Sequence, residues 1–181
     1  MKVLCTIKND GANTIDDFQN WVDEYSNSVY KFCRNLTYSK EDAENLFQET
    51  FLKAFEQSKK NTLTNPQSYL FSTSLYIWKS WKRKYARRKR IAPVRPLEDN
   101  MAGNTDIEND FIKQEEISII KGIVESMQDK FRIPIILYYT MEMSISEIAL
   151  TLKIPAGTVK SRLFKARKFV EKGLVKINYE K

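Results

Sequence analysis

The residues best suited to binding chemistry lie near the end of the chain, on the last predicted helix. That helix would bury a periodic set of apolar residues, namely Val159, Leu163, Ala166 and Val170. At 100° per residue, the opposite side carries Ser161, Phe164, Lys165 and Lys168, with Lys160 and Arg162 on its flanks. Cations hold phosphates or reach guanine edges, a serine hydroxyl hydrogen-bonds adaptably, and an exposed phenyl ring contacts thymine methyl groups. This face predicts binding to duplex DNA; the competing interpretation is a solvated basic face on a surface helix.

A capped helix and a short turn precede this basic helix. Ser144 with Glu147 has the spacing of a capping box, and apolar residues follow it at once. Ile154-Pro155 then interrupts the pattern before the basic helix starts. Capped helix, tight turn and longer basic helix together have the spacing of a helix-turn-helix. The spacing therefore favours DNA binding over a solvated surface.

A second cationic segment ends a long helix predicted from about residue 66 to 90. Residues 79–90 carry eight bases and no acid, and they interleave with Tyr76, Trp78, Trp81 and Tyr85. Cations follow a nucleic-acid backbone while exposed rings stack on unpaired bases, so this pattern is typical of single-strand binding. The alternative is a basic helix end whose aromatic residues lie in the core, and Trp81 is expected to point inward.

A third candidate surface lies on a helix that Ser39 and Asp42 are expected to cap. The face opposite its apolar side carries Asn45, Gln48, Glu49 and Leu52. An apolar side chain among polar ones indicates a partner surface, against the alternative of a solvated face with one stray leucine. The nearby acids Glu41, Asp42 and Glu44 stand in the first turn, where they stabilise the helix dipole, so no catalytic pair is predicted there.

Composition excludes several kinds of site and predicts that the chain has no cofactor. The 181 residues include no histidine, so imidazole metal ligands and histidine bases are absent and no metal site is expected. Cys5 and Cys33 lie far apart, which argues against a disulfide scaffold and fits a reducing cytoplasm. Five glycines provide no glycine-rich phosphate loop. The longest apolar run, near Ile133–Tyr139, is far shorter than a membrane span, so no membrane insertion is expected.

Helical periodicity and caps predict an all-α chain of two small domains joined by a flexible linker. We expect an N-terminal arm over residues 1–14, a helical domain over 15–90, an acidic linker over 91–111 and a second helical domain over 112–175. Thr14 with Asp17 is the predicted cap of the first helix, and Asn65-Pro66 that of the third. Ile117, Ile120 and Val124 are the predicted apolar repeat that opens the second domain. Pro134 predicts that the next helix starts close to Phe131 or is kinked.

The formal net charge of +7 is unevenly distributed along the chain. Residues 10–57 carry ten acids and four bases, and residues 97–116 carry seven acids and one base. Residues 79–90 and 153–172 hold the two basic blocks. The chain therefore has two basic surfaces separated by an acidic spacer rather than a uniformly basic surface, and the basic surfaces favour polyanionic partners.

The segments 144–149 and 154–167 resemble region four of bacterial sigma factors, in particular those of the extracytoplasmic-function (ECF) group. In that family the last helix reads the minus-thirty-five promoter element. The resemblance implies that this element is bound by Thr158, Lys160, Ser161, Arg162, Phe164, Lys165 and Lys168. Lys153 stands where the family usually has glycine at the turn, and a left-handed backbone there costs a non-glycine residue roughly 1–2 kcal/mol.

The segment Asp42–Phe51 resembles region two of the same family. The resemblance implies that the clamp helices of core RNA polymerase are contacted by Asn45, Gln48, Glu49 and Leu52. It implies that the minus-ten element is bound by Tyr76, Lys79, Ser80, Lys82, Arg83, Lys84 and Arg87. The implied partners are core RNA polymerase (clamp helices and flap), promoter DNA and an anti-sigma factor, and the chain is expected to have no catalytic residues.

The alternative function is a stand-alone helix-turn-helix regulator whose first ninety residues form a dimerisation or sensing domain. That alternative predicts a dimer on palindromic duplex DNA without polymerase. A nucleic-acid-modifying enzyme would need a metal or acid–base cluster, for which a chain without histidine offers no candidate.

Overall fold

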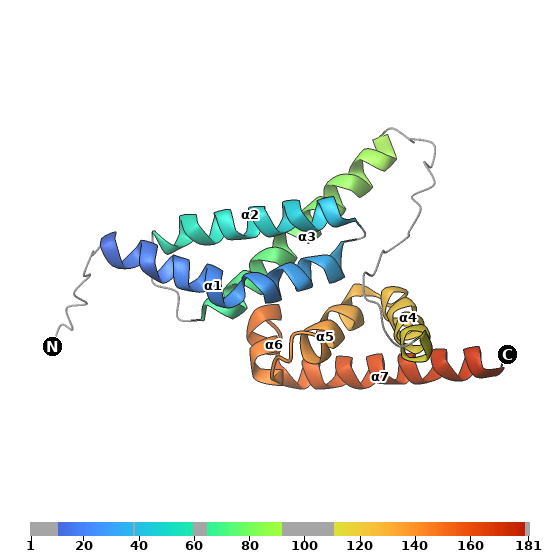
Figure 1. Cartoon of the computed structure of the whole chain (residues 1–181). Helices are drawn as coiled ribbons and strands as arrows, with labels where there is room; N and C mark the ends of the chain where they lie inside the picture. Colours follow the sequence, from blue (N-terminus) through green and yellow to red (C-terminus); the bar gives the residue numbers. More distant parts are fainter. Residues whose placement is uncertain (1–10, 38, 60–64, 92–110, 180–181) are drawn as a thin grey trace. The chain divides into compact units, whose positions relative to one another are not determined.

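The computed structural model describes residues 11–37, 39–59, 65–91 and 111–179, and over these residues the chain forms seven α-helices and no strand (Figure 1). The chain divides into two compact units, Met1–Pro93 and Val94–Lys181. The prediction of an all-α chain with two helical domains is thus confirmed. The predicted acidic linker lies outside the described residues except for its ends, because Ile91 closes one helix and Phe111 opens the next.

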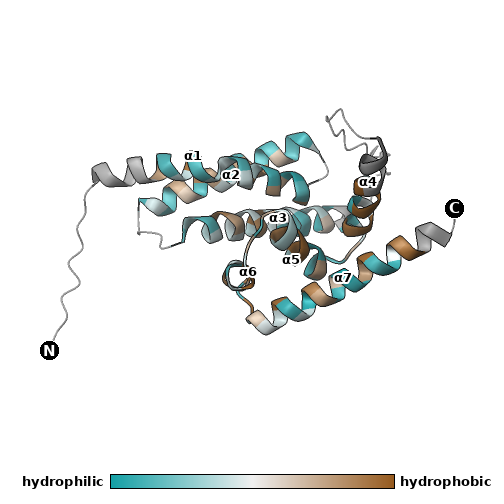
Figure 2. Ribbon diagram, turned by 60° about the horizontal axis from the view of Figure 1, so that its bottom comes forward, coloured by the Kyte–Doolittle hydropathy of each residue, from teal (hydrophilic) through white to brown (hydrophobic). Residues whose placement is uncertain are grey.

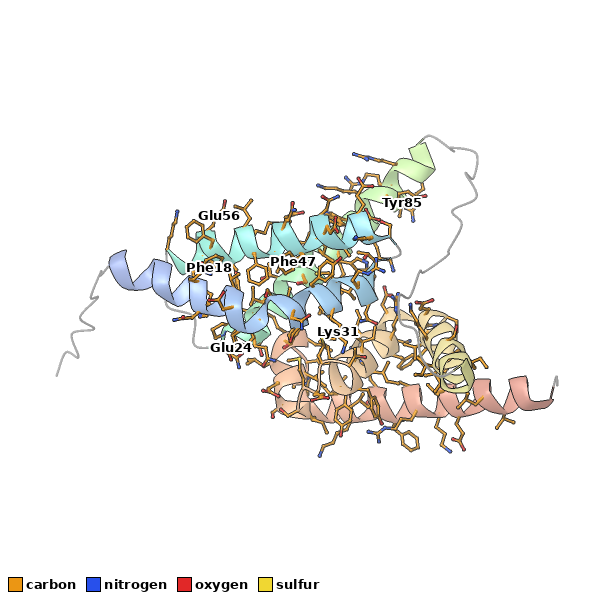
Figure 3. The ribbon with its side chains drawn as sticks, viewed as in Figure 1. Phe18, Glu24, Lys31, Phe47, Glu56 and Tyr85 are labelled. Carbon is orange, nitrogen blue, oxygen red and sulfur yellow. The ribbon has the colours of Figure 1, made fainter. Side chains whose placement is uncertain are left out.

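The first unit is a bundle of three mutually packed helices, α1 (Gly11–Leu36), α2 (Lys40–Ser58) and α3 (Pro66–Ile91). Phe32, Leu46 and Phe71 are fully buried where the helices meet, and the rings of Phe32 and Phe71 pack edge to face with centroids 5.0 Å apart. Phe18 and Phe47 lie between α1 and α2, as Figure 3 shows. Burial of Phe32, Phe71 and the aliphatic residues around them stabilises the unit.

Two of the three predicted caps in this unit are confirmed. The Asp42 amide donates to Ser39 Oγ (3.0 Å), and the Ser68 amide donates to Asn65 Oδ1 (2.9 Å) just before Pro66 opens α3. The prediction that Thr14 caps the first helix is wrong, since α1 already begins at Gly11. The predicted arm over residues 1–14 is therefore partly helical, and residues 1–10 lie outside the described part.

The prediction that Trp81 lies in the core is also corrected. Trp78 is the buried tryptophan of α3, with 5% of its surface exposed, whereas Trp81 is half-buried. The reason is length: Figure 1 shows the last turns of α3 projecting beyond α1 and α2, so these turns have no helix to pack against. Tyr85, labelled on this projecting end in Figure 3, is 67% exposed.

Small polar side chains fill the position where α2 and α3 approach each other. Thr50 Oγ1 is 2.7 Å from the Leu46 carbonyl, to which it donates, and 3.1 Å from Ser74 Oγ. Cys33 of α1 is fully buried next to Ser74, and burial raises the pKa of its thiol to about 12. The Cys33 side chain is therefore a neutral, packed group at physiological pH.

The second unit consists of α4 (Phe111–Glu125), α5 (Asp129–Tyr139), α6 (Ile145–Leu152) and α7 (Ala156–Tyr179), with the three shorter helices packed against α7. Leu137, Ile148 and Leu163 form the centre of its core. Hydrophobic and hydrophilic residues alternate along α7 in Figure 2, because one side of it faces the short helices and the other faces solvent. The inward residues Val159, Leu163 and Ala166 are buried as predicted.

One detail of this unit differs from the sequence-based expectation. Ile117 and Ile120 are exposed, because α4 packs on α7 through Ile123 instead. Pro134 lies inside α5, which begins at Asp129, two residues before Phe131, in keeping with the predicted start close to Phe131. Among the described residues, no helix is both long and apolar enough to cross a membrane.

Candidate nucleic-acid interface

The helix-turn-helix begins with the predicted capping box, which the structure confirms in both directions. The Ser144 amide donates to Glu147 Oε2 (2.7 Å), and the Glu147 amide donates to Ser144 Oγ (3.3 Å). Hydrogen bonding of the Glu147 carboxyl to the Ser144 side chain and to the Ser144 amide lowers the pKa of that carboxyl, against the weaker opposing effect of burial. The capping box fixes the residue at which α6 starts.

The turn between α6 and α7 is closed by a residue in the left-handed conformation. Lys153 has φ 54° and ψ 47°. Its amide donates to the Leu150 carbonyl (3.3 Å) and the Ile154 amide donates to the Ala149 carbonyl (3.1 Å), which is the Schellman pattern. Lys153 therefore adopts the left-handed conformation that glycine would adopt without strain. The turn has the same geometry as with glycine, and the lysine backbone is strained in the folded protein.

The solvent side of α7 presents most of the predicted minus-thirty-five residues. Lys160, Ser161, Phe164, Lys165 and Lys168 are exposed, and Phe164 keeps 60% of its surface accessible. Thr158 and Arg162 are half-buried at the edges of the face. An exposed phenyl ring among cations offers an apolar contact for thymine methyl groups together with charges for phosphates, so this face has the composition of a DNA-reading surface.

Contacts within this face hold some of its side chains in place. Ser161 Oγ donates to the Thr158 carbonyl (3.0 Å), which leaves the hydroxyl oxygen free to accept. Lys168 Nζ lies 5.9 Å from the Phe164 ring centroid and 3.8 Å from Glu171 Oε2. Because both partners of this ion pair are largely exposed, it is weak and competes little with a phosphate.

The predicted minus-ten residues lie mainly along one stripe of α3. At 100° per residue, the stripe is formed by Tyr76, Lys79, Ser80, Arg83 and Arg87, and Lys84 lies beside it. All of them except the half-buried Ser80 are exposed, and Tyr76 keeps 64% of its surface accessible. Lys82 points elsewhere, since its Nζ lies over the Trp78 ring at 4.6 Å from the centroid. The stripe joins one exposed ring to three cations, as single-strand binding requires.

The face of α2 predicted to bind polymerase is open to solvent. Asn45, Gln48 and Leu52 are exposed, with 59% of the leucine surface accessible, while Glu49 is half-buried. Lys53 Nζ lies 3.0 Å from Glu49 Oε1 and 5.7 Å from the Tyr76 ring centroid, so this lysine joins the α2 face to the α3 stripe. The sequence analysis did not include Lys53 in this surface, although its position four residues after Glu49 predicts an ion pair between the two side chains.

A groove of about 350 Å³ runs beside this face between α1 and α2. Its lining comprises Ser26, Asn27, Tyr30, Glu44, Phe47 and Gln48. The Tyr30 and Phe47 rings pack edge to face across it, with centroids 5.8 Å apart. Gln48 thus belongs to both the groove and the exposed face. Among the described residues, no group of three or more Cys, Asp or Glu side chains could hold a metal ion.

Known families match both units of the chain. The family described as sigma-70 region 2 matches residues 21–90, and that described as sigma-70 region 4 matches residues 117–170. The matches follow the order of the two units, and each includes the exposed basic helix of its unit. The chain belongs to the sigma-70 family. The region 2 match does not favour the stand-alone regulator, which would have an unrelated first domain.

Curated relatives place this sigma factor in the ECF group. It is 29% identical to the ECF RNA polymerase sigma factor SigW of Bacillus subtilis (strain 168), over 88% of this chain and 89% of SigW. It is 26% identical to SigM of the same organism, over 79% of this chain and 86% of SigM.

Two solved structures share the fold of this sigma factor. The sigma factor RpoE of Bartonella quintana, solved with the anti-sigma factor NepR, has a TM-score of 0.69 at 22% identity, over 87% of this chain and 96% of that one. CnrH, solved with the cytosolic domain of CnrY, has a TM-score of 0.60 at 17% identity, over 87% and 86%.

Proposed function

We propose that this sigma factor binds core RNA polymerase through α2 and contacts a promoter at two places, through α7 and through α3. The observation that carries the proposal is the presence, on one chain, of both sigma-70 regions in order, each with an exposed cationic helix. A regulator with one DNA site would need only the second. The working modules are residues 15–90 and 112–175.

The solvent side of α7 reads the minus-thirty-five element as duplex DNA. Lys160 and Lys165 reach base edges or phosphates, Phe164 contacts thymine methyl groups, and Ser161 accepts or donates through its hydroxyl. Thr158 and Arg162 at the edges of the face, and Lys168 further along the helix, contact the flanking backbone. Because Lys and Arg side chains provide most of the polar groups on this face, the binding weakens steeply with salt.

The α3 stripe stabilises the opened strand at the minus-ten element. Tyr76 provides a ring on which an unpaired base stacks, and Lys79, Arg83 and Arg87 follow the strand backbone. Unstacking one base costs a few kcal/mol, which binding to this stripe offsets. Strand opening is therefore driven by binding free energy, and the protein has no catalytic step of its own.

The α2 face docks on the clamp helices of core polymerase. Leu52 buries its exposed surface there, and Asn45, Gln48 and Glu49 provide polar contacts around it. The second unit contacts the flap of polymerase. One structural relative was solved with an anti-sigma factor and another with the cytosolic domain of its partner, which supports control of this protein by an anti-sigma factor in the cytoplasm.

Association with core polymerase tests this function. The purified chain is mixed with core polymerase and a panel of promoter fragments, and specific run-off transcripts are measured. The double variant Gln48→Ala/Glu49→Ala should lose both core association and transcripts, while Lys121→Gln, on an exposed position of α4, should keep both. Sequence-specific duplex binding without any association with core polymerase would refute the proposal.

A further inference from the structure

Arg167 is held by two tyrosines on the edge of the face that we assign to the minus-thirty-five element. Its Nε donates to the Tyr139 hydroxyl oxygen (2.9 Å). The guanidinium carbon lies 5.7 Å from the Tyr138 ring centroid and 5.8 Å from that of Tyr139. The two rings are themselves edge to face, with centroids 4.9 Å apart. This contact joins the end of α5 to the middle of α7.

The charge of Arg167 is not neutralised by this contact. Among the described residues the side-chain contacts of Arg167 are those with the two tyrosines, neither of which offers a carboxylate to pair with the guanidinium. Glu171, one turn further along α7, is paired with Lys168 instead. The guanidinium has five N–H donors, and the bond to Tyr139 uses one of them, so its terminal nitrogens remain available to an anion.

The position of Arg167 is suited to a phosphate at the border of the groove. At 100° per residue it lies on the flank of α7 that also carries Lys160, next to Phe164. Arg167 and Tyr139 are both exposed, so a ligand reaches the terminal nitrogens. An arginine whose planar head is already oriented loses less side-chain entropy when it binds a phosphate than a freely rotating one.

We propose that Arg167, oriented by Tyr138 and Tyr139, is a DNA-backbone contact that flanks the base-reading face of α7. This inference rests on the proposed function of α7 and adds a residue to it. The ligand is a backbone phosphate, and the two tyrosines are positioning residues that aim the guanidinium.

The test measures the salt dependence of binding of the full chain to a fluorescent 20-base-pair duplex of mixed sequence, for which phosphate contacts dominate. Arg167→Gln should lower the slope of log K against log salt by about 0.9 and weaken binding about tenfold at 0.1 M salt. Arg167→Lys and Tyr139→Phe keep the charge, so the slope should stay unchanged while binding weakens about two- to fivefold. The control Lys121→Gln removes a charge from α4 and should change neither quantity.

The comparison of two variants separates failure of this inference from failure of the proposed function. If Lys165→Gln lowers the slope and Arg167→Gln leaves it at the wild-type value, the inference is wrong and Arg167 only packs α5 against α7. If neither variant changes the slope, the assignment of α7 itself fails. Should Arg167→Gln not fold, the Arg167 Nε–H resonance of the wild-type chain provides the readout. A shift on addition of duplex is expected, and no shift overturns the inference.

Discussion

Replacing Lys153 by glycine should stabilise the second unit without changing the fold. Lys153 holds φ 54° and ψ 47° at the end of α6, a conformation that costs a residue with a Cβ roughly 1–2 kcal/mol and costs glycine almost nothing. Glycine also increases the conformational entropy of the unfolded chain, which opposes folding by about 0.4–1 kcal/mol. With the middle of each range taken, about 1.5 and 0.7 kcal/mol, the net gain is about 0.5–1 kcal/mol.

The assay is thermal unfolding of the full chain, followed by circular dichroism, for Lys153→Gly and the matched variant Lys153→Ala. For a unit of this size, a gain of 0.5–1 kcal/mol corresponds to an increase of about 2–8 °C in Tm. Lys153→Ala keeps the Cβ and should leave Tm within about 1 °C of the wild type, since surface substitutions without such a feature change stability little. An equal increase for both variants would refute the reasoning, because the cause would then be removal of the lysine charge.

The remaining predictions concern packing, pH and thiol chemistry. Gly122→Ala should raise Tm, since its Cβ meets nothing within 4 Å and alanine favours helix by about 1 kcal/mol. Gly173→Ala should lower Tm, because its Cβ would stand 2.8 Å from Ile123 Cδ1 and 3.0 Å from both Ile123 Cγ atoms, so the whole buried Ile123 side chain would have to move. The reverse order of the two variants in a melting series would contradict this. The lowered pKa of Glu147 means that its carboxylate stabilises the fold above the ordinary pKa of 4.5, a contribution lost as the pH falls through the lower, folded-state value. The stability advantage over Glu147→Gln in urea titrations should therefore be constant from pH 6 to 8 and decrease below about pH 4.5, and an advantage that is undiminished at pH 3 would contradict it. Cys33, with a pKa of about 12, should react with a disulfide reagent at pH 8 about 10³-fold more slowly in the native chain than after unfolding, and equal rates would show that the thiol is accessible and ionised.

Features set by local chemistry were predictable from the sequence. The capping box of Ser144 and Glu147, the Ser39 cap and the Asn65-Pro66 start each depend on side chains within three residues of one another, and all three are present. The inward face of α7 followed from helical periodicity, because this helix is covered on one side by the other helices of its unit.

Features that depend on where neighbouring helices end were not predictable. Periodicity places Trp81 on the inward side of α3, but Trp81 is only half-buried and residues 82–88 after it are exposed, so this end of α3 is not covered by the other helices of its unit. In α4, isoleucines stand on more than one face, so the sequence could not show that Ile123, rather than Ile117 or Ile120, meets α7.

The contact between Arg167 and Tyr139 joins residues 28 apart in the sequence, and no local pattern indicates it. The groove beside Gln48 is likewise formed by two helices whose register is set only by packing. Residue type and helical spacing predict which residues share each of the three faces. Their contacts with other helices cannot be predicted in this way and are known only from the folded structure.

The most direct measurement of the central claim is a footprint of the holoenzyme on a promoter from the run-off panel, combined with permanganate reactivity of unpaired thymines. Wild-type protein should protect an upstream duplex site and expose reactive thymines downstream. Lys160→Gln/Lys165→Gln should lose the upstream protection, and Tyr76→Ala/Arg83→Gln should keep it while losing the downstream reactivity. Loss of both signals together in each variant, at unchanged core association, would contradict the assignment of two separate DNA contacts to α7 and α3.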